Sequence, residues 1–373
     1  MVNHQRLIGL FMEMVQISSV SGREGAFRDY LINYFAARGL KGEEDNTADY
    51  TGGDSGNLLF RIKGTVAAEP ILFSAHMDTV VPGNDIKPVL GDDGIIRSQG
   101  NTILGSDDKA GVAAILEAYE VLLERGLDYP PLEFLFTVSE EQGLLGARNF
   151  NYNRLKSRIA YVLDGGGVPG TIVIQSPCQN EIEYHVTGRA AHAGINPEDG
   201  LNAIQIMSKA LAAMPCGRID ASTTCNFGVI EGGQARNIVA ASCMVKGEAR
   251  SLERFELDRL TRELQDTFID EVTKHGGQPE VKVTFLYPEI SLNAQDKVIN
   301  LAAEAARGIG LNVKLISTGG GSDASIINGN NIPCANLGIG MSSVHTTEEY
   351  IRTNDLIKDA ELVLAIIQKS ITD

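Results

Sequence analysis

The sequence predicts an α/β protein with a doubly wound, mostly parallel sheet and a smaller domain inserted into it. Short apolar runs alternate with amphipathic helical stretches from the N-terminus on, which is typical of doubly wound folds. After Ser176 the order changes to strand, helix, two strands, helix and strand, and from Asn293 the first rhythm resumes. We therefore expect one domain formed by residues 1–178 and 289–373, and an inserted ferredoxin-like (βαββαβ) domain formed by residues 179–288.

The elements of the larger domain are expected in short apolar segments. The strands are expected at NLLFRIKG near residue 57, ILFSAHMD at 71, LEFLFTVSEE at 132, AYVLDGG at 160, VKLIST and ANLGIG. The helices are expected at the N-terminus, from Asp107 to Arg125, at AAEAARGIG, and in a last segment ending near Ser370. In the 107–125 helix, apolar residues from Val112 to Leu123 recur at spacings of three and four, which predicts one buried stripe and a charged opposite face.

The inserted domain is expected to follow its own order. The segments are EIEYHVTG, NAIQIMSKALAAM, TTCNFGVIEGG, NIVAASCMVKGEARS, ERFELDRLTRELQDTFIDEVTKHG and EVKVTFLYPEI. Strand and helix patterns alternate in them as a βαββαβ unit requires.

Composition excludes several classes of function. The 373 residues are 43% hydrophobic and 21% charged, which is the balance of a chain with a sizeable core. A formal net charge of −16 disfavours binding to nucleic acid or to an anionic membrane surface. Five cysteines without CxxC spacing predict neither a disulfide framework nor a thiolate zinc site, and favour a cytoplasmic location. We find no signal peptide pattern and no apolar run of the roughly 18 residues needed for a membrane span.

Polar side chains that can bind metals lie at the ends of the expected strands. His76 ends ILFSAHMD, and Asp78 points to the same side of an extended chain, so its carboxylate can orient the imidazole. Glu140 and Glu141 end LEFLFTVSEE and could act separately as a base and a metal ligand. Asp164 ends AYVLDGG. Taken singly, each residue also has an ordinary explanation as a turn former or a solvated charge.

Two further sites complete the candidate set. Asp107 and Asp108 open a helix and, taken alone, would be N-terminal caps that complement the helix dipole. His345 lies in SSVHTTEEY, where a surface histidine would be unremarkable. For the residues at strand ends, joint placement favours a site. The residues concerned are His76, Glu140, Glu141 and Asp164, with His345 beyond a further strand, and open α/β sheets gather ligands at the carboxyl ends of their strands. Two histidines and several carboxylates without thiolates predict a hydrolytic site for divalent metal ions.

Five motifs in a fixed order carry a family resemblance. They are HMDTV, GSDDKAG, EEQGLLGAR, LDGGG and VHTTEEY. In these motifs the chain resembles the co-catalytic zinc exopeptidases, the peptidase T, carboxypeptidase G and aminoacylase family, and most closely the peptidase T-like branch. The resemblance spans essentially the whole chain, including the insert, which it implies to be a dimerisation and lid domain.

The resemblance implies a role for each site residue. One metal ion would be bound by His76, Asp107 and Asp164, and a second by Asp107, Glu141 and His345. Glu140 would be the general base, Asp78 the acid that orients His76, and the bond between Asp107 and Asp108 a cis peptide. Two zinc ions per chain are expected, although the ligand set also suits cobalt or manganese.

The resemblance also implies substrate-binding residues. His192 in GRAAHAGINPEDGLNA would reach the active site of the partner subunit and stabilise the oxyanion. Asn237 and Arg250 would hold the polar end of the substrate, although Arg250 could instead form an ordinary surface ion pair. Gly320 and Ser322, in GGGSDAS, would lie along the substrate backbone. Peptidase T carries an arginine where this chain has Gly319, which weakens a strict tripeptide specificity.

We therefore predict a cytoplasmic, homodimeric two-metal hydrolase that cleaves an amide bond of short peptides. It would be a zinc-dependent, tripeptidase-like exopeptidase, and specifically an aminopeptidase, that uses metal-bound hydroxide with Glu140 as the general base. The alternatives are an N-acyl-amino-acid or carboxypeptidase-like amidohydrolase of the same family, and a catalytically silent protein that binds metal or peptide. All the ligands and Glu140 are present, which disfavours the silent alternative.

Overall fold

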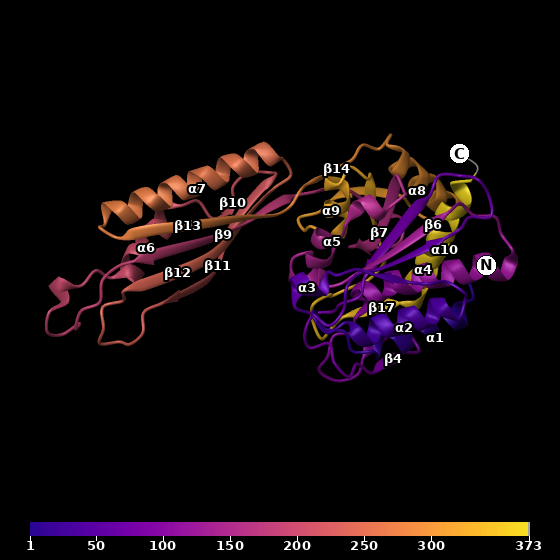
Figure 1. Cartoon of the computed structure of the whole chain (residues 1–373), viewed down its shortest axis with the longest axis horizontal. Coiled ribbons are helices and arrows are strands. Elements are labelled where there is room, and N and C mark those ends of the chain that lie inside the picture. Colours follow the sequence, from indigo (N-terminus) through magenta and orange to yellow (C-terminus); the bar gives the residue numbers. More distant parts are fainter. Residues whose placement is uncertain (372–373) are drawn as a thin grey trace. The chain divides into compact units, whose positions relative to one another are not determined.

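The computed structural model describes residues 1–371, and the chain forms two compact units. Unit 1 comprises Met1–Gln175, Ser291–Thr318 and the residues from Ser322 onwards. Unit 2 comprises Ser176–Ile290 together with Gly319–Gly321, a glycine run that the sequence division left in the larger domain. Figure 1 labels many of the helices and strands of both units.

Unit 1 is built on a mixed sheet with a parallel centre. The strand order is β1-β2-β6-β3-β7-β16-β8-β14, and β15 pairs with β8. The bounds are β1 Glu43–Glu44, β2 Leu58–Ile62, β3 Ile71–His76, β6 Leu132–Thr137, β7 Ile159–Gly165, β8 Thr171–Ser176, β14 Ile290–Ser291, β15 Lys314–Ser317 and β16 Cys334–Gly338. β3 runs parallel to both β6 and β7, and β7 runs parallel to β16. The predicted α/β fold with a mostly parallel central sheet is thus confirmed for the strands that carry the site residues.

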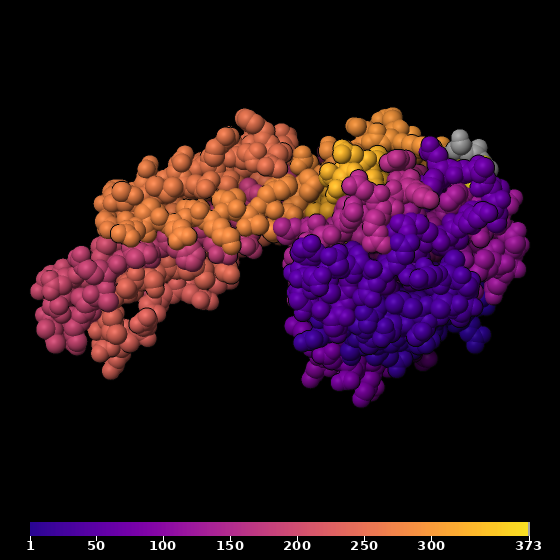
Figure 2. Space-filling view, in the orientation of Figure 1, coloured from indigo at the N-terminus to yellow at the C-terminus, as the bar shows by residue number. Residues whose placement is uncertain are grey.

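Helices surround this sheet. They are α1 His4–Val15, α2 Gly25–Ala36, α3 Ala48–Thr51, α4 Ser106–Arg125, α5 Leu145–Asn149, α8 Lys297–Gly308, α9 Asp323–Gly329 and α10 Thr353–Lys369, with short 3-10 turns at Glu140–Gln142 and Tyr152–Arg154. The N-terminal residues, drawn in indigo, cover much of the face of unit 1 seen in the space-filling view (Figure 2). A separate small sheet of β4 Pro88–Leu90, β5 Ile95–Ser98 and β17 Tyr350–Arg352 was not expected from the sequence.

The packing of α4 differs from the expected single stripe. The helix contacts α1 and α10 as well as β3 and β7, so it is covered on several sides. Glu117 is fully buried and receives the Arg6 side chain at 2.6 Å, whereas Leu123 is 42% exposed. The predicted stripe is buried from Val112 to Leu122, but the expected burial of Leu123 was wrong. The opposite face is not a purely charged outer face either, because Glu117 on it is buried. Neighbouring helices, which the periodicity of α4 does not encode, decide its burial.

Unit 2 is an antiparallel sheet with two helices. Its strand order is β10-β11-β12-β9-β13. The bounds are β9 Cys178–Thr187, α6 Ala203–Ala213, β10 Gly217–Arg218, β11 Thr223–Gly232, β12 Ser242–Ser251, α7 Arg254–Lys274 and β13 Gln278–Tyr287, with a 3-10 turn at Pro197–Asp199. Apart from the two-residue β10, the elements follow the order strand, helix, strand, strand, helix, strand. Buried residues of α6, α7 and the strands form a core separate from that of unit 1.

The helices show no membrane-spanning candidate. Within residues 1–371, no helix combines the length and the apolar character that crossing a membrane requires.

Candidate active site

The carboxyl ends of β3, β6 and β7 bring the predicted metal ligands to one edge of the sheet. β3 ends at His76, which is in register with Thr137 at the end of β6. The 3-10 turn Glu140–Gln142 follows β6, and Asp164 lies near the end of β7. Because these strands are adjacent and parallel, the side chains that follow them converge.

The ligand atoms form two triads that share Asp107. His76 Nε2 lies 3.0 Å from Asp107 Oδ1 and 4.0 Å from Asp164 Oδ1. His345 Nε2 lies 2.9 Å from Glu141 Oε1 and 3.3 Å from Asp107 Oδ2. In each triad the possible ligand atoms lie within 4.8 Å of one another. The two oxygens of Asp107 therefore face different histidines, as a bridging carboxylate would.

The backbone around Asp107 departs from a regular helix start. Asp107 and Asp108 have non-helical dihedral angles although α4 continues after them, and the peptide bond between them is cis. The cis bond that the resemblance implies is confirmed. Asp108 Oδ2 accepts a hydrogen bond from the His76 backbone N–H at 3.1 Å, and its Oδ1 accepts one from the Gly111 N–H at 3.2 Å. This residue therefore caps the first turn of α4 and also links that turn to β3.

Asp78 contacts the imidazole of His76 and also the turn that carries Glu140 and Glu141. The Nδ1 atom of His76 is 2.9 Å from the Asp78 carbonyl oxygen and 3.5 Å from its carboxylate. The carboxylate also accepts hydrogen bonds from the backbone N–H groups of Glu140 at 2.9 Å and Glu141 at 3.2 Å, and from Ser21 Oγ at 2.7 Å. Asp78 thus fixes the turn that carries both glutamates as well as the orientation of His76.

The electrostatics of the cluster favour bound cations. Burial, and then the neighbouring carboxylate of Asp164, raise the pKa of Glu140 well above its ordinary value. Burial and then Asp107 do the same for the pKa of Asp164. Hydrogen bonds with Asp107 and Glu141 raise the pKa of His345 to about 10. A site with this much negative charge, and with only imidazole nitrogen and carboxylate oxygen as donors, fits divalent zinc, cobalt or manganese.

Comparison with known proteins places this site in a family. The profile described as Peptidase family M20/M25/M40 matches residues 72–369. This chain belongs to peptidase family M20. The structure of aminopeptidase PepT from Bacillus cereus ATCC 10987 is 41% identical and superimposes with a TM-score of 0.91, with 99% of each chain covered. A tripeptidase from Staphylococcus aureus is 39% identical with a TM-score of 0.96 and full coverage of both chains. Peptidase T of Escherichia fergusonii is 25% identical over 280 residues, which are 74% of this chain and 67% of that protein. The predicted likeness to the peptidase T-like branch is confirmed.

The residues that the M20 resemblance assigns to substrate are divided between the units. His192 and Asn237 are exposed in unit 2, where the Ala193 N–H donates to the Asn237 carbonyl at 3.0 Å. Gly320 belongs to the glycine run of unit 2, and Ser322 is buried in unit 1, where its Oγ accepts a hydrogen bond from Asn336. The metal-ligand cluster lies wholly within unit 1.

Arg250, also in unit 2, already has partners. Its Nε and Nη2 donate to the two oxygens of Glu248 at 2.9 and 3.0 Å, and Nη1 donates to the Gly319 carbonyl at 3.2 Å. The sequence left open that Arg250 forms an ordinary ion pair instead of binding substrate, and an ion pair with Glu248 is present. A substrate carboxylate at Arg250 would therefore add to this network or displace Glu248.

Two buried acids of the M20 site were not identified from the sequence. Glu349, in the quoted motif VHTTEEY, accepts hydrogen bonds from the backbone next to Asp107. Asp323, which follows Ser322 after the glycine run, accepts one from Thr137 Oγ1, and burial raises its pKa to about 6. Both acids lie in motifs that were singled out in the sequence, VHTTEEY and GGGSDAS. Neither the residue type nor the spacing in these motifs predicts their hydrogen bonds.

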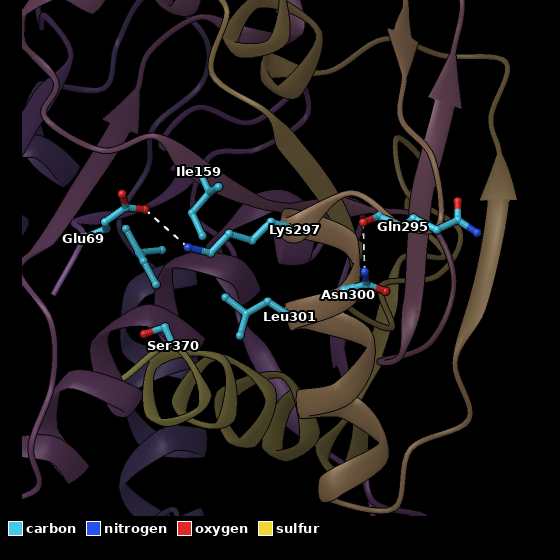
Figure 3. Close-up of a pocket in the computed structure, with 8 residues that line it drawn as sticks. Glu69, Ile159, Gln295, Lys297, Asn300, Leu301 and Ser370 are labelled. Atoms are coloured by element: carbon cyan, nitrogen blue, oxygen red, sulfur yellow. Dashed lines mark hydrogen bonds and ion pairs between the residues drawn. The ribbon is translucent and has the colours of Figure 1, made fainter. Parts of the chain in front are cut away.

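A pocket at the opposite edge of the sheet is separate from the site. It has a volume of about 310 Å³, and its lining includes Ile71 and Ile159, the first residues of β3 and β7. Figure 3 shows the Lys297–Glu69 ion pair of this pocket, which joins the side chains at 3.3 Å. The predicted metal ligands lie at the carboxyl ends of β3 and β7, so this pocket is not part of the candidate active site.

Proposed function

We propose that this M20 peptidase is a two-metal exopeptidase that removes the N-terminal residue from short peptides, tripeptides among them. The observation that carries the proposal is the pair of triads that share Asp107. Relatives with about two fifths of their residues identical, named aminopeptidase PepT and tripeptidase, support the substrate class.

His76, Asp107 and Asp164 would hold one ion, and Asp107, Glu141 and His345 the other; zinc is the metal we expect. Two such ions would polarise the scissile carbonyl and lower the pKa of the attacking water. Glu140 would take a proton from that water and deliver it to the leaving amine. Burial beside Asp164 raises the pKa of Glu140, which favours uptake of that proton. Asp78 would hold Glu140 in place through its backbone.

We assign unit 2 the role of a ferredoxin-like dimerisation domain that carries His192 to the partner subunit's site. Arg250 and Asn237 would hold the substrate carboxylate, with Gly320 and Ser322 along its backbone. The half-buried guanidinium of Arg250 supports a second candidate as well, an N-acyl-amino-acid or carboxypeptidase-like amidohydrolase, because those substrates also present a carboxylate. The five unpaired cysteines support our proposal of a reducing, cytoplasmic location.

The test uses protein stripped with a chelator and reloaded with zinc. We expect about two metal ions per chain, recovery of activity on reloading, and faster cleavage of free tripeptides than of dipeptides or N-acyl amino acids. Preference for N-acyl amino acids would favour the second candidate. A single bound ion, or no amide hydrolysis after reloading, would contradict the proposed function.

A further inference from the structure

Glu349 is a buried carboxylate that collects hydrogen bonds from one short stretch of backbone. Its side chain is 2% exposed. The donors are the backbone N–H groups of Leu104 and Gly105 at 2.8 Å, Ser106 at 2.7 Å and Asp107 at 3.2 Å, and Ser106 Oγ at 2.5 Å. Five donors on one carboxylate satisfy a buried charge and fix the backbone that they belong to.

Glu349 also lies in the loop that carries His345, where its backbone N–H donates to the Thr346 carbonyl at 3.2 Å. Ser342 and Tyr350 exchange backbone hydrogen bonds of 3.0 Å, and His345 between them has a φ of 63°. The His345 side chain is 52% exposed, so packing contributes little to its position. Glu349 lies four residues after His345, and its carboxylate ties this loop to the residues before and at Asp107.

We propose that Glu349 is a positioning residue that sets the distance between Asp107 and His345, and so builds the metal site that these two ligands share with Glu141. The inference rests on the proposed function, because it assumes that this triad binds a metal. Without the carboxylate, four neighbouring N–H groups would lose their acceptor, and the two ligands would no longer be tied to each other. Groups that orient metal ligands typically contribute 10- to 100-fold to metal affinity.

The chain offers a control far from the site, a buried carboxylate that also binds backbone N–H groups and differs by an added ion pair with Arg61 at 3.4 Å. Glu133 is 3% exposed, and its carboxylate accepts hydrogen bonds from the backbone of Lys156 and Ser157 and from Ser157 Oγ. It is the second residue of β6, at the end remote from Glu140. A role in stability alone predicts equal behaviour for Glu133 and Glu349. The exposed neighbour Glu348 controls for charge.

The experiment measures metal binding directly. Cobalt affinities of the full-length wild type, Glu349→Gln, Glu133→Gln and Glu348→Gln would be determined by competition with a chromophoric chelator, and the visible cobalt spectrum recorded. For Glu349→Gln we expect one of the two ions to bind about 10- to 100-fold more weakly, with an altered spectrum. Glu133→Gln should lower the melting temperature and keep both affinities, and Glu348→Gln should match the wild type.

A milder variant covers the case in which Glu349→Gln does not fold. Ser106→Ala removes one donor and keeps the carboxylate, so we expect a weakening of about two- to fivefold, in line with one lost hydrogen bond. Wild-type affinity in both Glu349→Gln and Ser106→Ala, or equal metal loss in Glu133→Gln, would overturn the inference and leave the proposed function intact. Failure of the wild type to bind two ions would overturn both.

Discussion

At the residue scale, Glu140 and Glu141 both have a carboxylate oxygen within 4.8 Å of a His76 ring nitrogen, but they differ in their other partners. Glu141 Oε1 lies 2.9 Å from His345 and belongs to a triad with Asp107. Burial and the nearby Asp164 raise the pKa of Glu140, whose backbone N–H is held by Asp78. The sequence presented the two glutamates as equals, and their side-chain environments separate them.

Substitution of each glutamate should therefore have a different effect. Glu140→Gln should keep both metals and lower turnover by at least about 100-fold, because the proton acceptor is lost. Glu141→Gln should instead weaken one metal ion. Elemental analysis combined with steady-state kinetics distinguishes the two. An active Glu140→Gln enzyme, or equal metal loss in both variants, would contradict the assigned roles.

Asp359, on α10, is a buried acid outside the site. It is 2% exposed, and neither carboxylate oxygen has a hydrogen-bond partner among residues 1–371. Burial, with a smaller contribution from Asp355, raises its pKa well above the ordinary value. The folded protein therefore keeps a proton that the unfolded chain releases above a pH of about 4. Stability contributed by this group is present below that pH and is lost as the pH rises towards the folded pKa.

Asp359→Asn should remove this pH dependence. The difference in unfolding free energy, variant minus wild type, should increase with pH from about 4 upwards, by at most about 1.4 kcal/mol per pH unit, until the folded pKa is reached. Urea unfolding at pH 4, 6 and 8 measures it. Asp270→Asn, on the exposed face of α7, is the control and should give a constant difference. A constant difference for Asp359→Asn as well would show that this carboxyl is not protonated in the fold.

At the scale of elements, α4 shows how neighbouring helices decide burial. Leu116 is fully buried and Leu123, two turns later, is 42% exposed. α4 packs against the sheet and against the helices α1 and α10. These neighbours leave Leu123, in the last turn of α4, 42% exposed. Both leucines fit the same apolar periodicity, so the pattern alone assigns them the same environment.

The two leucines provide a matched pair of substitutions. Leu116→Ala should lower the unfolding free energy by about 2 to 5 kcal/mol, through lost burial and a residual cavity. Leu123→Ala should cost less than about 1 kcal/mol, because much of the side chain is already in water. Chemical denaturation of the metal-free protein would compare them. Equal losses would mean that the tip of α4 is covered in solution.

At the scale of the whole molecule, the proposed role of His192 requires a dimer with shared sites. Glu140→Gln and His192→Ala subunits, each inactive alone, would be mixed and allowed to exchange. Half of the dimers are then mixed, and each has one intact site of two, so activity should recover to about one quarter of wild type. No recovery after demonstrated exchange, or a strictly monomeric protein, would contradict the shared site.

The sequence by itself determined the parallel strands β3, β6, β7 and β16 and the candidate ligands. Strand periodicity locates the carboxyl ends of β3, β6 and β7, and parallel pairing brings those ends together whatever the details of packing. His76, Asp164 and the two glutamates could therefore be named before any coordinates. The M20 motifs added Asp107 as the bridge.

Only the tertiary structure decided which groups hold those ligands. Glu349 meets Ser106 across 243 positions of the chain, and Asp78 meets Glu140 across 62. Such contacts join residues that are far apart in the sequence, so they depend on the path of the loops in the folded protein. A local pattern of residues does not predict that path. For the same reason the burial of Asp359 and the exposure of Leu123 could not be predicted, since each depends on the helices packed around it and not on its own sequence neighbours.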